Sequence, residues 1–224
     1  MASFLRKLKD VLITKSGQYN DRYGKNCQSQ SLDFRRNASS IFKGELPKKY
    51  VELVDMIPGE RVVEVGAGEG VLSLAVSAKK QAVRAIDYTP LRHEKGKEIQ
   101  AAWAKLGMDV DRCELVLGDV FDDPSLLDGF DTLVACRVIY YFGERTERFF
   151  EMASERMNYI VLIGNGRRAK RHARGHVSKD LGDSARLSTA DGMREILEKY
   201  GYEIVTEIRD NDPVVIGKRK IALG

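Results

Sequence analysis

Short apolar runs alternate with amphipathic stretches along the middle of the chain. Apolar runs bounded by polar residues and glycines predict β-strands at 61–65, 82–87, 113–119, 130–137 and 158–165. Apolar residues at helical spacing predict helices at 71–80, 93–107 and 144–157. Strands that alternate with helices in this way form a parallel sheet with helices on both faces. We therefore predict an α/β fold with a doubly wound sheet.

The last part of the chain has a different pattern. Helical spacing at 189–201 is followed by two apolar runs, at 202–208 and 213–220. The link between these runs, 209–212, is too short for a parallel crossover, so the two strands are expected to pair as an antiparallel hairpin. The predicted sheet is therefore mostly parallel and is closed by a C-terminal antiparallel hairpin.

Residues 1–58 lack the strand–helix alternation. Apolar residues at helical spacing predict a short basic amphipathic helix at 4–12, which either packs on a protein surface or makes a weak peripheral membrane contact. Residues 16–40 are polar with little periodicity and are expected to form a loop or a mobile segment. A further helix is expected at 48–57. We therefore divide the chain into a helical and lid extension, 1–58, and a main domain, 59–224.

Composition narrows the class of protein. The 224 residues are 43% hydrophobic and 31% charged, as in a globular domain with a sizeable core, and the net charge of +4 permits an anionic partner without requiring one. The three cysteines, Cys27, Cys113 and Cys136, show no paired spacing, which argues against a disulfide framework or a metal site. No apolar run is long enough for a transmembrane segment, and charges interrupt the apolar residues at the N-terminus, which argues against a signal peptide. A cytoplasmic protein is therefore expected.

The segment EVGAGEG at 64–70 joins the first predicted strand to a predicted helix. Glycines here let the backbone turn sharply and let a ligand approach closely, and the helix start offers free N–H groups. Many α/β folds use such a turn, so the motif is weak evidence alone. Asp87 and Asp119 end the next two strands, where a carboxylate can accept hydrogen bonds from ribose hydroxyls or meet an adenine edge. All three features are expected at the carboxyl edge of the sheet.

Together these features resemble the Rossmann-like, or class I, S-adenosylmethionine-dependent methyltransferases over about residues 60–219, on the motif acid–x–G–x–G–x–G. The resemblance implies S-adenosyl-L-methionine as the cofactor and a methyltransferase domain at 59–224. It also implies cofactor contacts by Glu64 beneath the methionine part, by Gly66, Ala67 and Gly68 lining it, by Asp87 at the ribose, by Tyr88, Asp119 and Val120 at the adenine, and by Cys136 and Arg137 beside the methyl group and the acceptor.

Two other interpretations of the glycine turn agree less well with the sequence. A nicotinamide-dependent dehydrogenase needs G-x-G-x-x-G, but here the third glycine comes one residue early and Val71 follows it. The terminal hairpin also argues against that class. A turn that only packs helix against strand would leave the acids at two successive strand ends as a coincidence.

Several segments are candidates for the lid and the acceptor side. Relatives often fold an N-terminal segment over the cofactor, which makes Tyr23 a candidate contact, with Tyr19 and Arg35 beside it; the alternative is a disordered arm. After the fourth strand, Tyr140, Tyr141 and Phe142 either wall the reaction centre or belong to the core, and Tyr141 is the catalytic candidate.

The segment at 165–179 is strongly basic and contains no acid. Its arginines suit an anionic acceptor, although a solvated charged loop is the alternative. His172 and His176 are spaced as a helical pair, but no third ligand is apparent, so a general base is favoured over a metal site. His93 is expected to be structural or exposed. The basic side chains of the segment are Arg167, Arg168, Lys170, Arg171, Arg174 and Lys179.

These patterns predict a methyltransferase that O-methylates a small anionic or sugar-containing acceptor. An RNA methyltransferase is the enzyme alternative, because the basic segment could follow a phosphate backbone. Against it stand the absence of an added RNA-binding module and the modest net charge. The third possibility is a cofactor-binding protein without catalysis that acts as a partner through its N-terminal helix.

Overall fold

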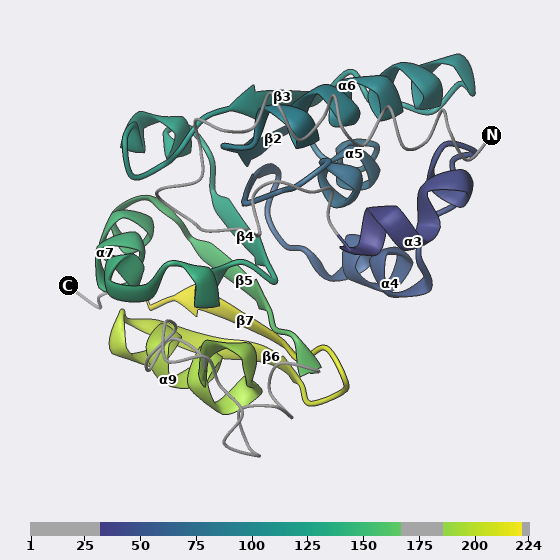
Figure 1. Cartoon of the computed structure of the whole chain (residues 1–224). Helices are drawn as coiled ribbons and strands as arrows, with labels where there is room; N and C mark the ends of the chain where they lie inside the picture. Colours follow the sequence, from purple (N-terminus) through teal and green to yellow (C-terminus); the bar gives the residue numbers. More distant parts are fainter. Residues whose placement is uncertain (1–31, 167–185, 221–224) are drawn as a thin grey trace.

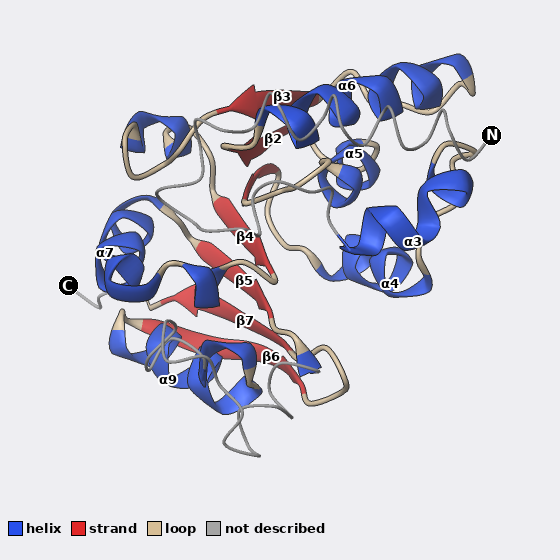
Figure 2. Cartoon of the chain, viewed as in Figure 1, coloured by secondary structure: helices blue, strands red, loops and turns tan. Residues whose placement is uncertain are grey.

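The computed structural model describes residues 32–166 and 186–220. Within these ranges a seven-stranded sheet has the order β3-β2-β1-β4-β5-β7-β6 (Figures 1 and 2). Strands β1 to β5 are parallel, and β7 runs antiparallel to both β5 and β6. The predicted fold class is therefore confirmed. The strands are β1 Arg61–Val65, β2 Ala82–Asp87, β3 Cys113–Leu117, β4 Thr132–Cys136, β5 Tyr159–Ile163, β6 Tyr202–Ile208 and β7 Val214–Arg219.

Helices cover both faces of the sheet. Neighbouring residues of β1 point into different cores, Val62 into one and Val63 into the other. The core around Val62 includes side chains of α3, α4, α5 and α6, and the core around Val63 includes side chains of α7 and α9. Burial on both faces explains why the central strands are nearly continuous apolar runs. The helices are α3 Leu32–Ile41, α4 Lys48–Met56, α5 Val71–Ser77, α6 Pro90–Lys105, α7 Thr146–Arg156 and α9 Ala190–Lys199, with short 3-10 turns η2 Pro124–Leu127, η3 Ile139–Tyr141 and η4 Gly143–Arg145.

Element boundaries differ from the predictions by a few residues. Helix α6 begins at Pro90, three residues before the predicted start, because proline suits the first position of a helix. Helix α5 ends at Ser77 rather than at residue 80, and strand β3 ends at Leu117. Such differences are usual at element ends, where the pattern of apolar residues is weakest.

The prediction of a loop at 16–40 was wrong where the structure describes it, because Leu32–Ile41 form helix α3. Phe34 and Ile41 are 3% and 1% exposed, and the indole Nε1 of Trp103 donates a hydrogen bond to the carbonyl of Ile41 at 2.6 Å. A segment this polar has little helical signal of its own, so packing against α6 decides its structure. Residues 16–31 and the predicted helix at 4–12 lie outside the described residues.

The described part of the predicted extension packs into the main core. Leu53, Val54 and Ile57 lie in the same apolar cluster as Val62 of β1 and Val71 of α5. The domain boundary at residue 58 stays a prediction. Among the described residues, no helix is long and apolar enough to cross a membrane.

Candidate functional site

The turn from β1 to α5 depends on glycine. Gly66, Gly68 and Gly70 have φ angles of 69°, 62° and 70°, a region that other residues rarely adopt. A Cβ on Gly66 would lie 2.4 Å from Cγ2 of Val138, too close for any side chain. Ala67, between the first two glycines, is half-buried. The glycines therefore shape the turn, and the turn packs directly against Val138, which lies two residues after the end of β4.

Asp87, at the end of β2, is hydrogen-bonded to this turn. The backbone N–H of Gly68 donates to Asp87 Oδ2 at 2.8 Å, and the N–H of Thr89 donates to Oδ1 at 2.8 Å. Arg92 adds an ion pair with an Nη1–Oδ2 distance of 3.8 Å. The carboxylate is 4% exposed, and an ionised carboxylate has about four acceptor positions, so it can still accept hydrogen bonds from ligand hydroxyls. The predicted proximity of Asp87 and the glycine turn is realised.

Thr89 was missed as a candidate site residue. Its hydroxyl is buried and has no hydrogen-bond partner within the described residues. The sequence signal was ambiguous, because a threonine before Pro90 is typical of a helix cap, yet the side chain makes no cap hydrogen bond. A buried polar group of this kind is often completed by a ligand. This orphaned hydroxyl, two residues from Asp87, fits a site that receives a polyhydroxylated ligand.

Glu64 lies inside β1 beneath the turn. It is 3% exposed and accepts a hydrogen bond of 2.5 Å from the hydroxyl of Ser73, on α5. Burial raises the pKa of Glu64 to about 7, with a smaller contribution from the charge of Asp87, while the Ser73 hydrogen bond acts against the rise. Glu64 therefore titrates near neutral pH.

This raised pKa predicts how the stability of the ligand-free protein depends on pH. The pKa of Glu64 rises from an ordinary 4.5 to about 7 on folding, so the stability from its protonated form is full below about pH 4.5 and is lost as the pH rises through about 7. A difference of this size corresponds to a free energy on the order of 3 kcal/mol. We expect Glu64→Gln to remove this pH dependence of the free energy of unfolding. The difference in stability between the variant and the parent should therefore favour the variant more at pH 8 than at pH 5. Urea unfolding across that range measures it, and parallel stability curves for the two proteins would contradict it.

Asp119 follows β3 and is also held by its surroundings. Its Oδ1 accepts the backbone N–H of Phe121 at 3.0 Å, and Oδ2 lies 3.8 Å from Nη1 of Arg145. The same guanidinium lies 4.2 Å above the ring of Phe121. Val120 is 2% exposed and belongs to the core beside Phe121. Arg145, from η4, could not be connected to Asp119 from the sequence.

Cys136 ends β4 and is followed by a residue in an unusual conformation. Arg137 has a φ of +57°, and it is the one non-glycine residue with positive φ in the described ranges. Its guanidinium forms an ion pair with Asp212, from the turn between β6 and β7. Cys136 and Tyr88, which follows β2, are both half-buried.

The three aromatic residues after β4 separate into two groups. Tyr140 and Phe142 are 1% and 7% exposed and belong to the core, where the amide of Asn165 donates to the Tyr140 hydroxyl at 3.2 Å. Tyr141 is 37% exposed, and its ring centroid lies 4.7 Å from that of Tyr140. Only Tyr141 presents an exposed ring, and its catalytic role stays a prediction.

Several predicted residues lie outside the described ranges. They are Tyr19, Tyr23, His172, His176 and the basic residues 167–179. The described residues on either side of that segment lie together, because the N–H of Asn165 donates to the carbonyl of Ser188 at 3.3 Å. His93 is half-buried on α6, and burial lowers its pKa. Within the described residues, no group of three or more His, Cys, Asp or Glu could hold a metal ion.

Comparisons with known proteins bear on the fold of the chain. No family model and no curated relative matches the chain. The fold of this chain, with its sheet order and terminal antiparallel hairpin, is similar to that of solved methyltransferase structures, which match it at low sequence identity.

One similar structure is magnesium protoporphyrin IX methyltransferase from Synechocystis PCC 6803 with bound SAH, at 14% identity and a TM-score of 0.55, covering 95% of this chain and 100% of that chain. A putative methyltransferase in complex with the Haloferax volcanii Trm112 activator matches at 14% identity and a TM-score of 0.59, covering 88% and 100%. An O-methyltransferase family protein from Burkholderia thailandensis matches at 13% identity and a TM-score of 0.58, covering 98% and 70%. At these identities the likeness concerns the fold.

Proposed function

We propose that the protein is an S-adenosyl-L-methionine-dependent methyltransferase. The observation that carries the proposal is the Asp87 carboxylate, which is bonded to the glycine turn at 2.8 Å with the orphaned hydroxyl of Thr89 close by. A carboxylate and a hydroxyl at this place suit the two hydroxyls of a ribose. The structures of the magnesium protoporphyrin IX methyltransferase with bound SAH and SAM support the choice of cofactor.

Each predicted contact has a place in this proposal. Asp87 and Thr89 would hold the ribose, and the glycine turn with Ala67 would line the methionine part above Glu64. Tyr88, Asp119 and Val120 would border the adenine. Cys136 and Arg137 would border the reactive end of the cofactor, beside the methyl group and the acceptor. When bound, the cofactor supplies an electrophilic methyl group, so the protein's own task is chiefly to hold an acceptor in line and to exclude water.

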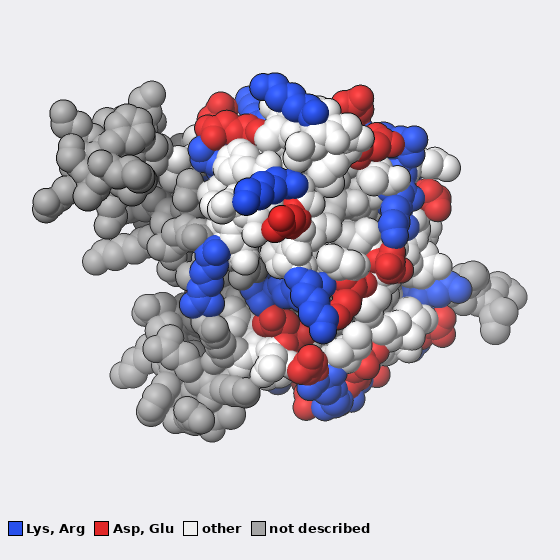
Figure 3. All heavy atoms as spheres, turned by 90° about the vertical axis from the view of Figure 1, so that its right-hand side faces the viewer, with Lys and Arg blue, Asp and Glu red and all other residues white. Residues whose placement is uncertain are grey.

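For the acceptor we propose a small anionic or sugar-containing molecule that is methylated on oxygen. The basic side chains at 165–179 would bind its anionic group, and Tyr141 would line the acceptor side. His172 or His176 would act as the general base for a hydroxyl, and Tyr23 would cover the cofactor. The face of the described residues in Figure 3 carries basic and acidic side chains intermixed, which suits a small acceptor better than a long phosphate backbone. A cytoplasmic location, for which the three cysteines without paired spacing argue, belongs to the same proposal.

Calorimetry with the full chain tests the cofactor. We expect binding of S-adenosylmethionine and S-adenosylhomocysteine and no binding of NAD. Transfer of labelled methyl groups to hydroxylated carboxylates, sugar phosphates and RNA then tests the acceptor class, with Arg167→Ala and Arg171→Ala as variants. If a small anionic acceptor is correct, these variants lose turnover while their cofactor affinity stays constant. Binding of NAD without either sulfur ligand would exclude the proposed class, and transfer to RNA alone would exclude the proposed acceptor.

A further inference from the structure

Charges follow a fixed order along the carboxyl edge of the sheet. The order of the strands is β3, β2, β1 and β4, and acids stand at the first three: Asp119 after β3, Asp87 ending β2 and Glu64 within β1. The first charged residue after β4 is Arg137, a cation. The strand-end residues on the β2 and β3 side of the glycine turn are therefore acids, which pair with Arg92 and Arg145, and the residue after β4 is a cation, which pairs with Asp212.

A second cation stands beside Arg137. The Nζ of Lys49, from α4, lies 3.6 Å from Asp212 Oδ2, the oxygen that also pairs with the Arg137 guanidinium. The backbone N–H of Gly166 lies 3.5 Å from Oδ1 of the same carboxylate. The side chains of Arg137, Lys49 and Asp212 are 22%, 26% and 28% exposed, while Nζ of Lys49 and Nε of Arg137 are themselves buried. We name these three residues the β4-end cluster.

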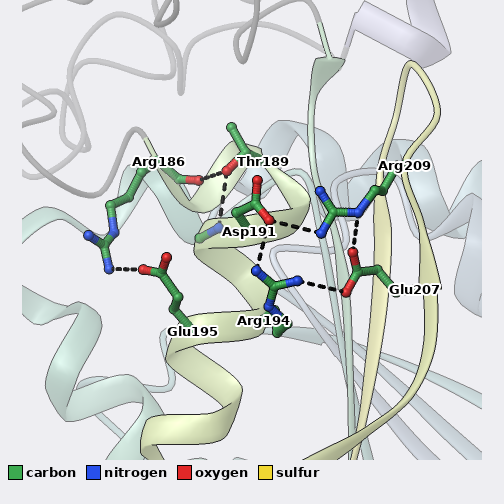
Figure 4. Close-up of polar contacts among 8 residues, drawn as sticks. Arg186, Thr189, Asp191, Arg194, Glu195, Glu207 and Arg209 are labelled. Carbon is green, nitrogen blue, oxygen red and sulfur yellow. Dashed lines mark hydrogen bonds and ion pairs between the residues drawn. The ribbon is translucent and has the colours of Figure 1, made fainter.

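The β4-end cluster is fixed by several elements. The N–H of Arg137 donates to the carbonyl of Ile163 at 2.8 Å, and the N–H of Gly164 donates to the carbonyl of Pro213, the residue after Asp212, at 2.8 Å. The turn that carries Asp212 is also tied to α9. Arg209, the residue after β6, forms an ion pair with Asp191 of α9 at a distance of 2.9 Å. Figure 4 shows this pair. Two cations are thus held in place before any ligand arrives, which lowers the cost of binding an anion.

The cluster adjoins the glycine turn. Val138, the residue after Arg137, is the one that a Cβ on Gly66 would meet at 2.4 Å. In the sheet order, β4 lies on one side of β1, and the strands of Asp87 and Asp119 lie on the other. A ligand whose hydroxyls contact Asp87 would therefore extend over the turn towards the β4-end cluster.

We propose that Arg137 and Lys49 bind the carboxylate at the amino-acid end of the cofactor. The inference rests on the proposed function and deepens it. S-Adenosylmethionine and S-adenosylhomocysteine carry the ribose hydroxyls on one side of the sulfur and the amino-acid carboxylate on the other, so a ribose at Asp87 lets the carboxylate extend past the glycine turn towards the cluster. A guanidinium has five N–H donors, so Arg137 can hold Asp212 and a ligand carboxylate at the same time. Asp212 is a positioning residue that aims both cations.

Two ligands separate this role from a structural one. S-Adenosylhomocysteine has the amino-acid end, and 5′-methylthioadenosine keeps the adenosine and the thioether but lacks it. We expect Lys49→Gln to weaken S-adenosylhomocysteine binding about tenfold and Arg137→Gly about thirtyfold, as for charge-assisted hydrogen bonds. Glycine is chosen because it accepts the φ of +57°. Binding of 5′-methylthioadenosine should change by less than about twofold. Loss of a cation cannot weaken binding of the ligand's ammonium group, so a loss restricted to S-adenosylhomocysteine reports its carboxylate.

Lys48→Gln is the matched control, because Lys48 is the preceding residue of α4, is 93% exposed and pairs with Glu52 at 4.0 Å. It should leave both affinities unchanged. Equal weakening of both ligands by Lys49→Gln, or no weakening of either, would overturn the inference while the proposed function stands. If the parent protein binds neither ligand, the proposed function itself fails. Should Arg137→Gly unfold, which thermal melting would show, Lys49→Gln alone decides.

Discussion

Asp87→Ala is expected to weaken S-adenosylhomocysteine binding by about a hundredfold or more. The carboxylate would accept hydrogen bonds from the ribose, and hydrogen bonds to a charged group contribute about 1.5–3 kcal/mol each. It also fixes the glycine turn, since the N–H of Gly68 donates to it at 2.8 Å. Removing Asp87 therefore removes a ligand contact and loosens the turn that shapes the site. Calorimetric titration of parent and variant measures the change.

Asp131→Ala is a matched control for this result. Asp131 precedes β4, and its Oδ2 accepts the backbone N–H groups of Glu60 and Arg61, each at 3.1 Å, at the opposite edge of the sheet. Both variants lose two backbone hydrogen bonds and should lose comparable stability. Only Asp87→Ala should lose affinity for the ligand. If the two variants bind S-adenosylhomocysteine equally well, Asp87 has no role in ribose recognition.

Trp103→Ala should destabilise the protein by about 3–5 kcal/mol, the usual cost of removing a large aromatic side chain from a core. The side chain is 0% exposed, and its indole N–H donates to the carbonyl of Ile41 at 2.6 Å. The substitution would leave a cavity between α6 and α3 and an unpaired carbonyl. Urea unfolding at constant pH measures the loss.

Leu106→Ala, at the end of the same helix, is the control, because Leu106 is 54% exposed. A change within about 0.5 kcal/mol is expected there. Trp103→Phe keeps most of the ring volume and should cost less than the alanine variant. If Trp103→Ala is as mild as Leu106→Ala, the packing of α3 against α6 does not stabilise the fold.

Polar contacts between distant parts of the chain could not be predicted. Arg137 and Asp212 are 75 residues apart, and Arg145 reaches Asp119 only because η4 lies beside the end of β3. Every arginine and aspartate in the sequence is a possible partner for every other, so pattern alone cannot select a pair. Thr89 was not predicted as a site residue for a different reason. A threonine directly before a helix is usually a helix cap, which is an ordinary structural role.

Local patterns in the sequence were enough to predict the succession of strands and helices, the terminal hairpin, and the place of the glycine turn and the two strand-end acids. These features follow from local rules: apolar runs form buried strands, a short link forces antiparallel pairing, and parallel strands bring their carboxyl ends to one edge. The helix at residues 32–41 became evident only in the folded chain, because its stability comes from Trp103 and the core that it packs against. The tertiary structure also decided which of three consecutive aromatic residues is exposed, since a 3-10 turn directs Tyr140 into the core and leaves Tyr141 at the surface. Burial and long-range pairing depend on segments that the chain brings together only after folding, and no local pattern encodes them.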